Sequence, residues 1–141
     1  MCIRDRVSGE HMEAYNKNPY TEVVAVCGRT EESAKRKLDE YGFTAKIYTD
    51  YEKMLEEEEI DIVSICTPNN LHPEETIIAA EKKKHILIEK PVALNEKDLK
   101  NMIEAVRKNH VKTLVSFVLH WNPLLMTIDK LLKDDAIGVI Y

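Results

Sequence analysis

Short apolar runs alternate along the chain with segments whose apolar residues recur at helical spacing. The runs cover residues 22–27, 45–49, 60–66, 85–89 and 112–118, and the helical segments cover 31–42, 51–59, 73–84 and 95–106. The runs are almost continuously apolar, which is typical of parallel strands that are covered by helices on both faces. This alternation with short loops predicts a doubly wound, Rossmann-like α/β fold with a parallel sheet.

Residues that favour helix ends support these boundaries. Gly42 is suited to stop the helix 31–42, and Pro73 fits the first turn of the helix that ends near residue 84. We expect three N-caps, at Asp50, Asn95 and Asn122. The helix after Asn95 is expected to bury one face, made of Leu99, Met102, Ile103 and Val106.

The two ends of the chain depart from the pattern. Residues 1–6, MCIRDR, contain three consecutive charged residues, so we predict a non-native leader there and not a buried strand. The sheet would then lack its first strand and expose the edge where that strand pairs. Residues 122–138 predict a last amphipathic helix, and AIGVIY (136–141) is typical of the start of a new strand.

Composition excludes several classes of protein. The 141 residues are 44% hydrophobic and 32% charged with a net charge of −5, which indicates a globular protein without the basic surface of a nucleic-acid-binding one. No apolar run approaches the ~18 residues that cross a bilayer, and the N-terminus lacks the apolar region of a signal peptide. Three scattered cysteines, Cys2, Cys27 and Cys66, argue against a disulfide framework and a metal site. We expect a cytoplasmic protein.

Ligands of doubly wound sheets bind at the carboxyl ends of the strands. A dinucleotide fold needs a glycine loop and a helix after its first strand, and here VSGEHMEAY resembles the end of that loop and the helix. Twenty residues after Ser8, where an acid binds the ribose of NAD, the chain has Gly28 and Arg29. Arg29 could bind the 2′-phosphate of NADP or stack on adenine, or it could be a surface base in a turn.

Two further strands end in polar residues. Thr67, Pro68 and Asn69 follow the strand 60–66, with His72 close behind, although a loop that caps a helix has the same composition. Glu89, Lys90 and Pro91 follow the strand 85–89. Lys90 could hydrogen-bond or protonate a substrate oxygen, or it could extend into water as strand-end lysines do.

Response-regulator receiver domains also carry Lys-Pro after their fifth strand. They require acids at the ends of the first and third strands. Here Asp61 stands at the wrong end of its strand, and Cys66 is near the place of the phosphoacceptor. The receiver interpretation is therefore not favoured.

Together these segments resemble the N-terminal domain of the Gfo/Idh/MocA oxidoreductases. The matching segments, in the order and spacing of that family, are SGEHMEAY, EVVAVCGRTEESAKRKLDEYG, DIVSICTPNNLH, ILIEKPVAL, VSFVLHWNP and AIGVI. The resemblance implies a partial dinucleotide-binding domain at 7–119 and the start of a truncated C-terminal substrate domain at 120–141.

The resemblance also implies a function. The family transfers hydride between NAD(P) and a sugar, cyclitol or similar polyol. Lys90 matches its catalytic lysine, Pro91 a proline that often follows a cis bond, and Glu89 their neighbour. The implied cofactor contacts are Ser8, Gly28, Arg29, Thr67, Pro68, Asn69, His72, Glu89, Lys90, Pro91, Trp121 and Asn122. His120 stands where the family has another base.

We expect NADP or NAD as cofactor, with NADP slightly favoured by Gly28 and Arg29. The parent protein would be a homo-oligomer, with neither nucleic acid nor membrane as partner. Because the glycine loop and the second domain are missing, we expect this chain to be inactive and to bind dinucleotide weakly. A non-catalytic dinucleotide sensor or scaffold is the alternative.

Overall fold

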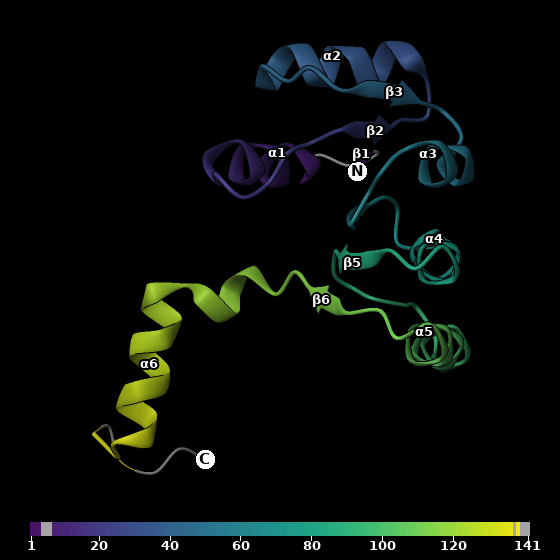
Figure 1. Ribbon diagram of the computed structural model, residues 1–141. Helices are drawn as coiled ribbons and strands as arrows, with labels where there is room; N and C mark the ends of the chain where they lie inside the picture. Colours follow the sequence, from purple (N-terminus) through teal and green to yellow (C-terminus); the bar gives the residue numbers. More distant parts are fainter. Residues whose placement is uncertain (4–6, 137, 139–141) are drawn as a thin grey trace.

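Six parallel strands form one sheet in the order β3-β2-β1-β4-β5-β6. The computed structural model describes residues 1–3, 7–136 and 138 (Figure 1). The strands are β1 (Cys2–Ile3), β2 (Ala25–Cys27), β3 (Lys46–Tyr48), β4 (Ile62–Cys66), β5 (His85–Ile88) and β6 (Thr113–Val115). This order is that of the doubly wound dinucleotide-binding fold, as the alternating pattern predicts.

The first strand is present, which corrects the expectation that the sheet lacks it. Cys2 pairs with Cys27 of β2 and with Ile65 of β4, and Ile3 pairs with Cys66. A strand of two residues needs only its backbone groups to complete a ladder, and the charged residues 4–6 that argued against a strand come after it. The edge predicted to be exposed is therefore filled. Residues 4–6 lie outside the described residues.

Helices follow the strands with the capping residues that the sequence predicts. They are α1 (Ser8–Lys17), α2 (Glu31–Tyr41), α3 (Tyr51–Glu57), α4 (His72–Glu81), α5 (Glu96–Asn109), the 3-10 helix η1 (Val118–Trp121) and α6 (Pro123–Lys133). Asp50 and Asn95 each accept a hydrogen bond from the backbone N–H three residues on, at 3.0 and 2.9 Å. Gly42 ends α2 in the left-handed conformation, with φ 70°.

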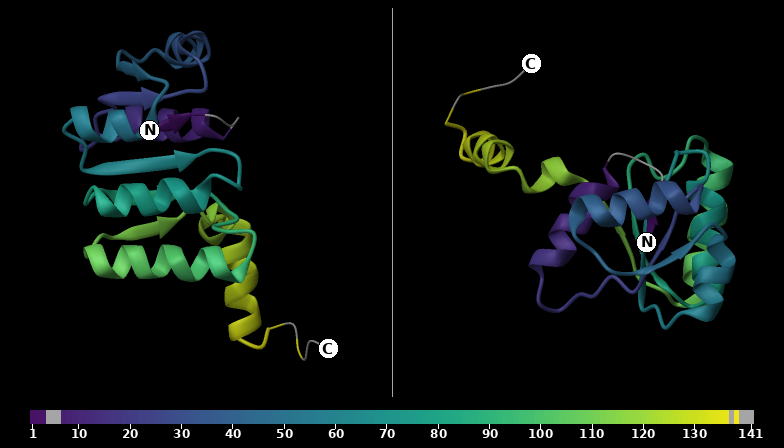
Figure 2. Two further views of the ribbon diagram at one scale, coloured as in Figure 1. Left: turned by 90° about the vertical axis from the view of Figure 1, so that its right-hand side faces the viewer. Right: turned by 90° about the horizontal axis from the view of Figure 1, so that it is seen from above.

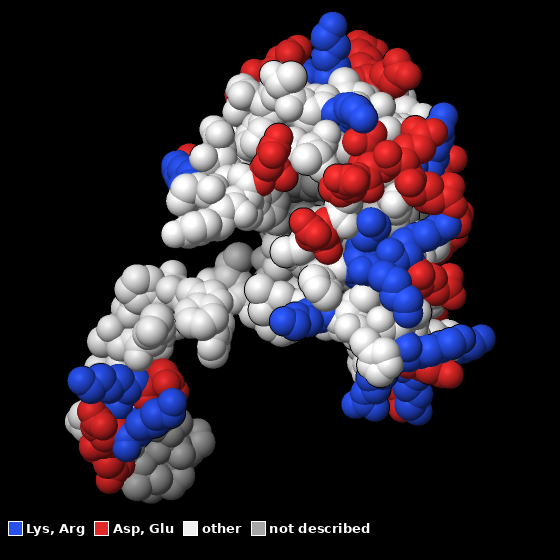
Figure 3. Space-filling model, in the orientation of Figure 1, with Lys and Arg blue, Asp and Glu red and all other residues white. Residues whose placement is uncertain are grey.

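The two faces of the sheet are covered unequally. Helices α3, α4 and α5 lie on one face, while α1 and α2 lie on the other beside the half that contains β1–β3 (Figures 1 and 2). On the open half, Ile62 is 59% and Leu114 66% exposed, beside a groove of about 330 Å³. Burial on both faces, predicted from the apolar runs, is therefore wrong for this half. Figure 3 shows the charged side chains gathered over α3–α5 and an uncharged hollow beside η1 and α6.

The core divides between these layers. One cluster packs between the sheet and α3–α5 and contains Met54, Val63, Ile65 and Ile88. The other packs between the sheet and α1–α2 and contains Met12, Val26, Ala34 and Leu38. Of the predicted core face of α5, Met102 is 3% exposed, whereas Leu99 and Ile103 are 39% and 40% exposed. Leu99 and Ile103 are partly exposed because α5 is the last helix of its layer, with no further helix beside it.

The segment after β6 projects from the sheet (Figure 2). Asn122 caps α6 by accepting from the Leu124 N–H at 3.0 Å, as predicted, and the apolar residues of α6 are exposed. The strand expected over 136–141 falls on residues of which 137 and 139–141 lie outside the described part. No helix among the described residues is long and apolar enough to cross a bilayer.

Candidate active and dinucleotide site

The candidate residues come from turns at one edge of the sheet. Parallel strands all end at the same edge, so the turns after β2, β4 and β5 lie together there (Figure 2). The chain order reverses at β1, which is flanked by β2 and β4. Crevices at such a switch point are where open α/β sheets bind ligands. The predicted residues of these three turns therefore lie at the edge of the sheet where such folds bind ligands.

His72 connects the turn after β4 to the turn after β5. Its Nε2 lies 2.9 Å from the carbonyl oxygen of Thr67, and its Nδ1 lies 2.9 Å from that of Pro91. The ring is fully buried. A direct contact with a dinucleotide would need one of these two bonds to break, so His72 holds loops in place here and does not line the surface.

The loop after β4 combines one buried and two exposed candidates. Thr67 is buried and its hydroxyl donates to Oε2 of Glu75 at 2.7 Å, while Pro68 and Asn69 are exposed. Thr67 thus orients the loop from within. Pro68 and Asn69 are the two that a ligand could touch.

Glu89 forms a buried pair with His11, which the sequence did not single out. Nε2 of His11 lies 2.8 Å from Oε1 of Glu89, and the two side chains are 10% and 6% exposed. Burial raises the pKa of the Glu89 carboxyl, but hydrogen bonds from Ser116, His11 and the Lys90 N–H outweigh it, and the pKa lies below its ordinary value. Glu89 is therefore held as a carboxylate directly before Lys90.

The other ring nitrogen of His11 extends this network into the sheet. Nδ1 lies 3.3 Å from the Ser64 hydroxyl and 3.4 Å from that of Tyr15. Burial desolvates the phenolate of Tyr15 and raises the pKa of this residue to about 12. A serine inside the apolar run 60–66 was the one signal in the sequence that pointed to a polar cluster here.

Lys90 is exposed at the carboxyl end of β5. Its backbone N–H donates to Oε2 of Glu89 at 3.2 Å, and its ammonium group has no partner among the residues that the structure describes. The Lys90–Pro91 peptide bond is cis, which confirms the expectation from the resemblance. The lysine is thus available to a ligand at the edge of the sheet.

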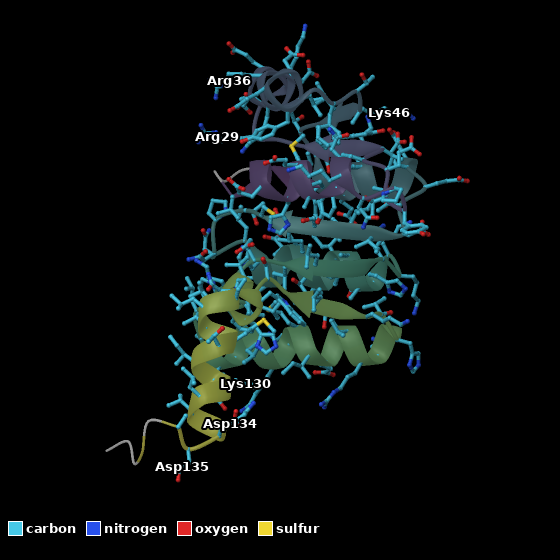
Figure 4. All side chains as sticks on the ribbon, turned by 90° about the vertical axis from the view of Figure 1, so that its left-hand side faces the viewer. Arg29, Arg36, Lys46, Lys130, Asp134 and Asp135 are labelled. Atoms are coloured by element: carbon cyan, nitrogen blue, oxygen red, sulfur yellow. The ribbon has the colours of Figure 1, made fainter. Side chains whose placement is uncertain are left out.

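The turn after β2 approaches α2 closely. A Cβ on Gly28 would lie 2.9 Å from Cβ of Ala34 and 3.1 Å from the Thr30 carbonyl oxygen, so a side chain does not fit there. Arg29 is exposed, and Figure 4 shows it at the same end of the molecule as Arg36 of α2. Ser8, the first residue of α1, is fully buried and accepts a hydrogen bond from Lys37.

The remaining candidates lie on the projecting segment. Trp121 is 72% exposed, and the Asn122 side chain is engaged as the cap of α6. Their roles toward a cofactor stay predictions, like those of the other candidates. No group of three or more metal-ligating side chains occurs among the described residues.

Comparison with known proteins agrees with a dinucleotide-binding fold. The model of the family described as "Oxidoreductase family, NAD-binding Rossmann fold" (GFO_IDH_MocA) matches residues 6–117. An inositol 2-dehydrogenase/D-chiro-inositol 3-dehydrogenase of Lactiplantibacillus plantarum is 31% identical over 135 residues, 94% of this chain and 38% of that protein. A trans-1,2-dihydrobenzene-1,2-diol dehydrogenase of Xenopus laevis is 29% identical over 98% of this chain and 42% of its own length.

Solved structures show the same fold. The WlbA dehydrogenase from Bordetella pertussis, in complex with NADH and UDP-GlcNAcA, superposes with a TM-score of 0.89 at 26% identity, over 99% of this chain and 42% of that one. The myo-inositol 2-dehydrogenase from Lactobacillus plantarum gives 0.89 at 24% identity, over 99% and 41%. This chain spans about two fifths of the length of these relatives. With most of its residues matched, the chain belongs to the Gfo/Idh/MocA oxidoreductase family with an NAD-binding Rossmann fold.

Proposed function

We propose that the chain is the dinucleotide-binding part of a dehydrogenase whose substrate is a sugar, cyclitol or similar polyol. Residues 120–141 would begin the substrate domain, through which the parent protein would form homo-oligomers. The observation that carries this proposal is the position of Lys90. It stands exposed, without a partner among the described residues, at the ligand-binding edge of a sheet with dinucleotide-binding order.

The residues fit most of a nicotinamide dinucleotide. The N-terminus of α1 follows β1, and a helix N-terminus in this place is where a pyrophosphate would bind. The loops after β4 and β5 would line the nicotinamide half. The part that does not fit is the turn between β1 and α1, where the sequence has Arg4, Asp5 and Arg6 in place of glycines.

NADP would be slightly favoured over NAD. An acid after β2 accepts the 2′-hydroxyl of NAD, and this chain has Gly28 and Arg29 there. Arg36 of α2 lies at the same end of the molecule and could add a second positive charge toward a 2′-phosphate (Figure 4). The dehydrogenases with bound NADH among the structural relatives give no support for this preference, so it stands on the two arginines alone.

A bound nicotinamide would supply the hydride acceptor or donor. Lys90 would hydrogen-bond the substrate oxygen and take or give its proton as the C–O bond changes order. Glu89, a carboxylate directly before it, would fix the backbone at the Lys90 N–H. The His11 pair would hold Glu89 in turn.

The test of Lys90 uses the protein extended by its substrate domain, with inositols and related polyols as substrates. Lys90→Ala should lower kcat by about 10²-fold or more while leaving NADPH binding unchanged, since its side chain contributes a proton transfer. Lys100→Ala removes an exposed lysine of α5 and serves as the matched control. Turnover that Lys90→Ala hardly changes, with cofactor binding intact, would show that the assignment is wrong.

The 141-residue chain itself should be inactive and should bind dinucleotide weakly, because the phosphate-binding glycines are missing. Calorimetry with NADPH and NADH checks this. Micromolar binding of either cofactor would contradict it, and a loss of binding confined to NADPH in Arg29→Ala would support the assignment of Arg29 to the 2′-phosphate.

A further inference from the structure

A cavity lies on the helix-covered face of the sheet, between α4, α5 and the strands β5 and β6. Its volume is about 290 Å³, and its walls are mostly aliphatic, including Ile88, Val92, Met102 and Val106. Leu99 and Ile103 of α5 also line the cavity and are 39% and 40% exposed, so it opens to the surface beside that helix. This size and this lining suit a small, largely apolar molecule.

Thr76 of α4 brings one polar group to the wall of this cavity. The residue is 2% exposed, and its hydroxyl makes no hydrogen bond to any residue that the structure describes. A threonine inside a helix can satisfy its hydroxyl by donating to the backbone carbonyl one turn earlier. A buried hydroxyl that is left unpaired costs free energy, so such groups are rare and need an explanation. A ligand with an oxygen beside Thr76 would supply the partner.

A base stands at the mouth of the same cavity. Arg107 lines the cavity, is exposed, and forms no ion pair with a described residue. Together with Ile103 it also lines a hollow on α5 whose other residues are Lys100, Glu104 and Lys108. Lys100 pairs with Glu96 of the same helix, which leaves two bases against one acid. The mouth is therefore complementary to an anion, and an arginine can bind a carboxylate through two parallel hydrogen bonds.

We propose that this cavity binds a small amphipathic carboxylate whose apolar body carries one hydroxyl group. The carboxylate pairs with Arg107, the body contacts the aliphatic walls, and the hydroxyl meets that of Thr76, since each hydroxyl can donate or accept. An aromatic ring suits the body, because the thioether of Met102 lines the cavity and sulfur contacts ring edges favourably. The site does not depend on the proposed oxidoreductase function, although Val92, two residues after Lys90, belongs to its wall.

Two ligands that differ by one oxygen test the site on the 141-residue chain: 3-(4-hydroxyphenyl)propionate and 3-phenylpropionate. NMR titration of the ¹⁵N-labelled chain measures both affinities and locates the binding. We expect saturable shifts of the backbone amides of Thr76, Val92 and Val106. The hydroxylated ligand should bind about 3- to 10-fold more tightly because it makes one more hydrogen bond. Equal affinities, no saturable binding of either ligand, or shifts confined to the open groove beside Ile62 and Leu114 would overturn the proposal.

Variants assign the two polar contacts. Thr76→Val keeps the shape of the side chain without its hydroxyl, so it should abolish the advantage of the hydroxylated ligand and leave the binding of 3-phenylpropionate unchanged. Arg107→Gln should weaken both ligands by about 2- to 5-fold. Lys97→Gln, the matched control, removes an exposed base of α5 that lines neither hollow and should change neither affinity. An advantage that persists in Thr76→Val, or equal losses in Arg107→Gln and Lys97→Gln, would contradict the proposal. The comparison of the two ligands on the wild-type chain holds even if Thr76→Val does not fold.

Discussion

Replacing Glu89 by glutamine should destabilise the chain although it preserves the shape of the side chain. Three donors converge on this carboxylate: Nε2 of His11 at 2.8 Å, the Lys90 N–H at 3.2 Å, and Ser116. Because the pKa of Glu89 lies below its ordinary value, the folded chain favours the charged form over the neutral one in spite of burial. A glutamine amide has no charged form, so the stabilisation that the folded chain gives to the Glu89 carboxylate is lost.

The expected loss is about 1–2 kcal/mol in the free energy of unfolding. Hydrogen bonds to a charged group contribute about 1.5–3 kcal/mol and neutral ones about 0.5–1.5, so each strong bond loses about 1 kcal/mol when the charge is removed. The bonds from His11 and the Lys90 N–H together give about 2 kcal/mol. Relief of the desolvation cost of the carboxylate offsets part of this, since an amide is cheaper to bury than an ion.

The loss should depend on pH in one direction. A carboxyl group whose pKa is lowered by folding contributes stability above its unfolded pKa and loses it as the pH falls through the folded pKa. The difference between wild type and Glu89→Gln should therefore be largest near pH 7 and shrink from about pH 5 downward. Urea unfolding followed by circular dichroism at a series of pH values measures both quantities.

Glu13→Gln is the matched control. It removes a carboxylate from an ion pair with Lys17 whose side chains are 53% and 74% exposed, so we expect little change at any pH. If Glu89→Gln changes the free energy of unfolding no more than Glu13→Gln does at pH 7, the hydrogen bonds to the Glu89 carboxylate do not stabilise the fold. If the loss is the same at pH 4 as at pH 7, the carboxylate charge is not its cause.

Three further perturbations test the packing and the network. Gly28→Ala should lower the free energy of unfolding by about 1–3 kcal/mol, because its Cβ would lie 2.9 Å from Cβ of Ala34; urea unfolding checks this. Met54→Ala should cost about 2–5 kcal/mol by the same measurement, since the side chain is fully buried. Burial raises the pKa of Tyr15 to about 12, so the part of the near-ultraviolet absorbance change that Tyr15→Phe removes should titrate above the ordinary tyrosine value of about 10. Since that pKa is raised above the unfolded value, stability should fall as the pH rises above about 10.

Features set by residues close in sequence could be predicted well. Asp50 and Asn95 cap helices through an N–H three residues away, and Gly42 stops α2 at its own position. These interactions need no partner from elsewhere in the chain. The apolar runs likewise placed every strand except the first, though each strand is shorter than its run, β2 and β6 most of all.

The sequence by itself therefore determined the fold class, the family resemblance and the turns where candidates stand. Tertiary structure alone decided which residues meet: His11 and Glu89 are 78 positions apart, and His72 joins Thr67 to Pro91 across two strands. It also decided that Cys2–Ile3 lies in the centre of the sheet and that Ile62 and Leu114 face outward. The physical reason is that such contacts depend on strand order and on which helix covers which face, and neither is encoded in a local pattern of apolar and polar residues.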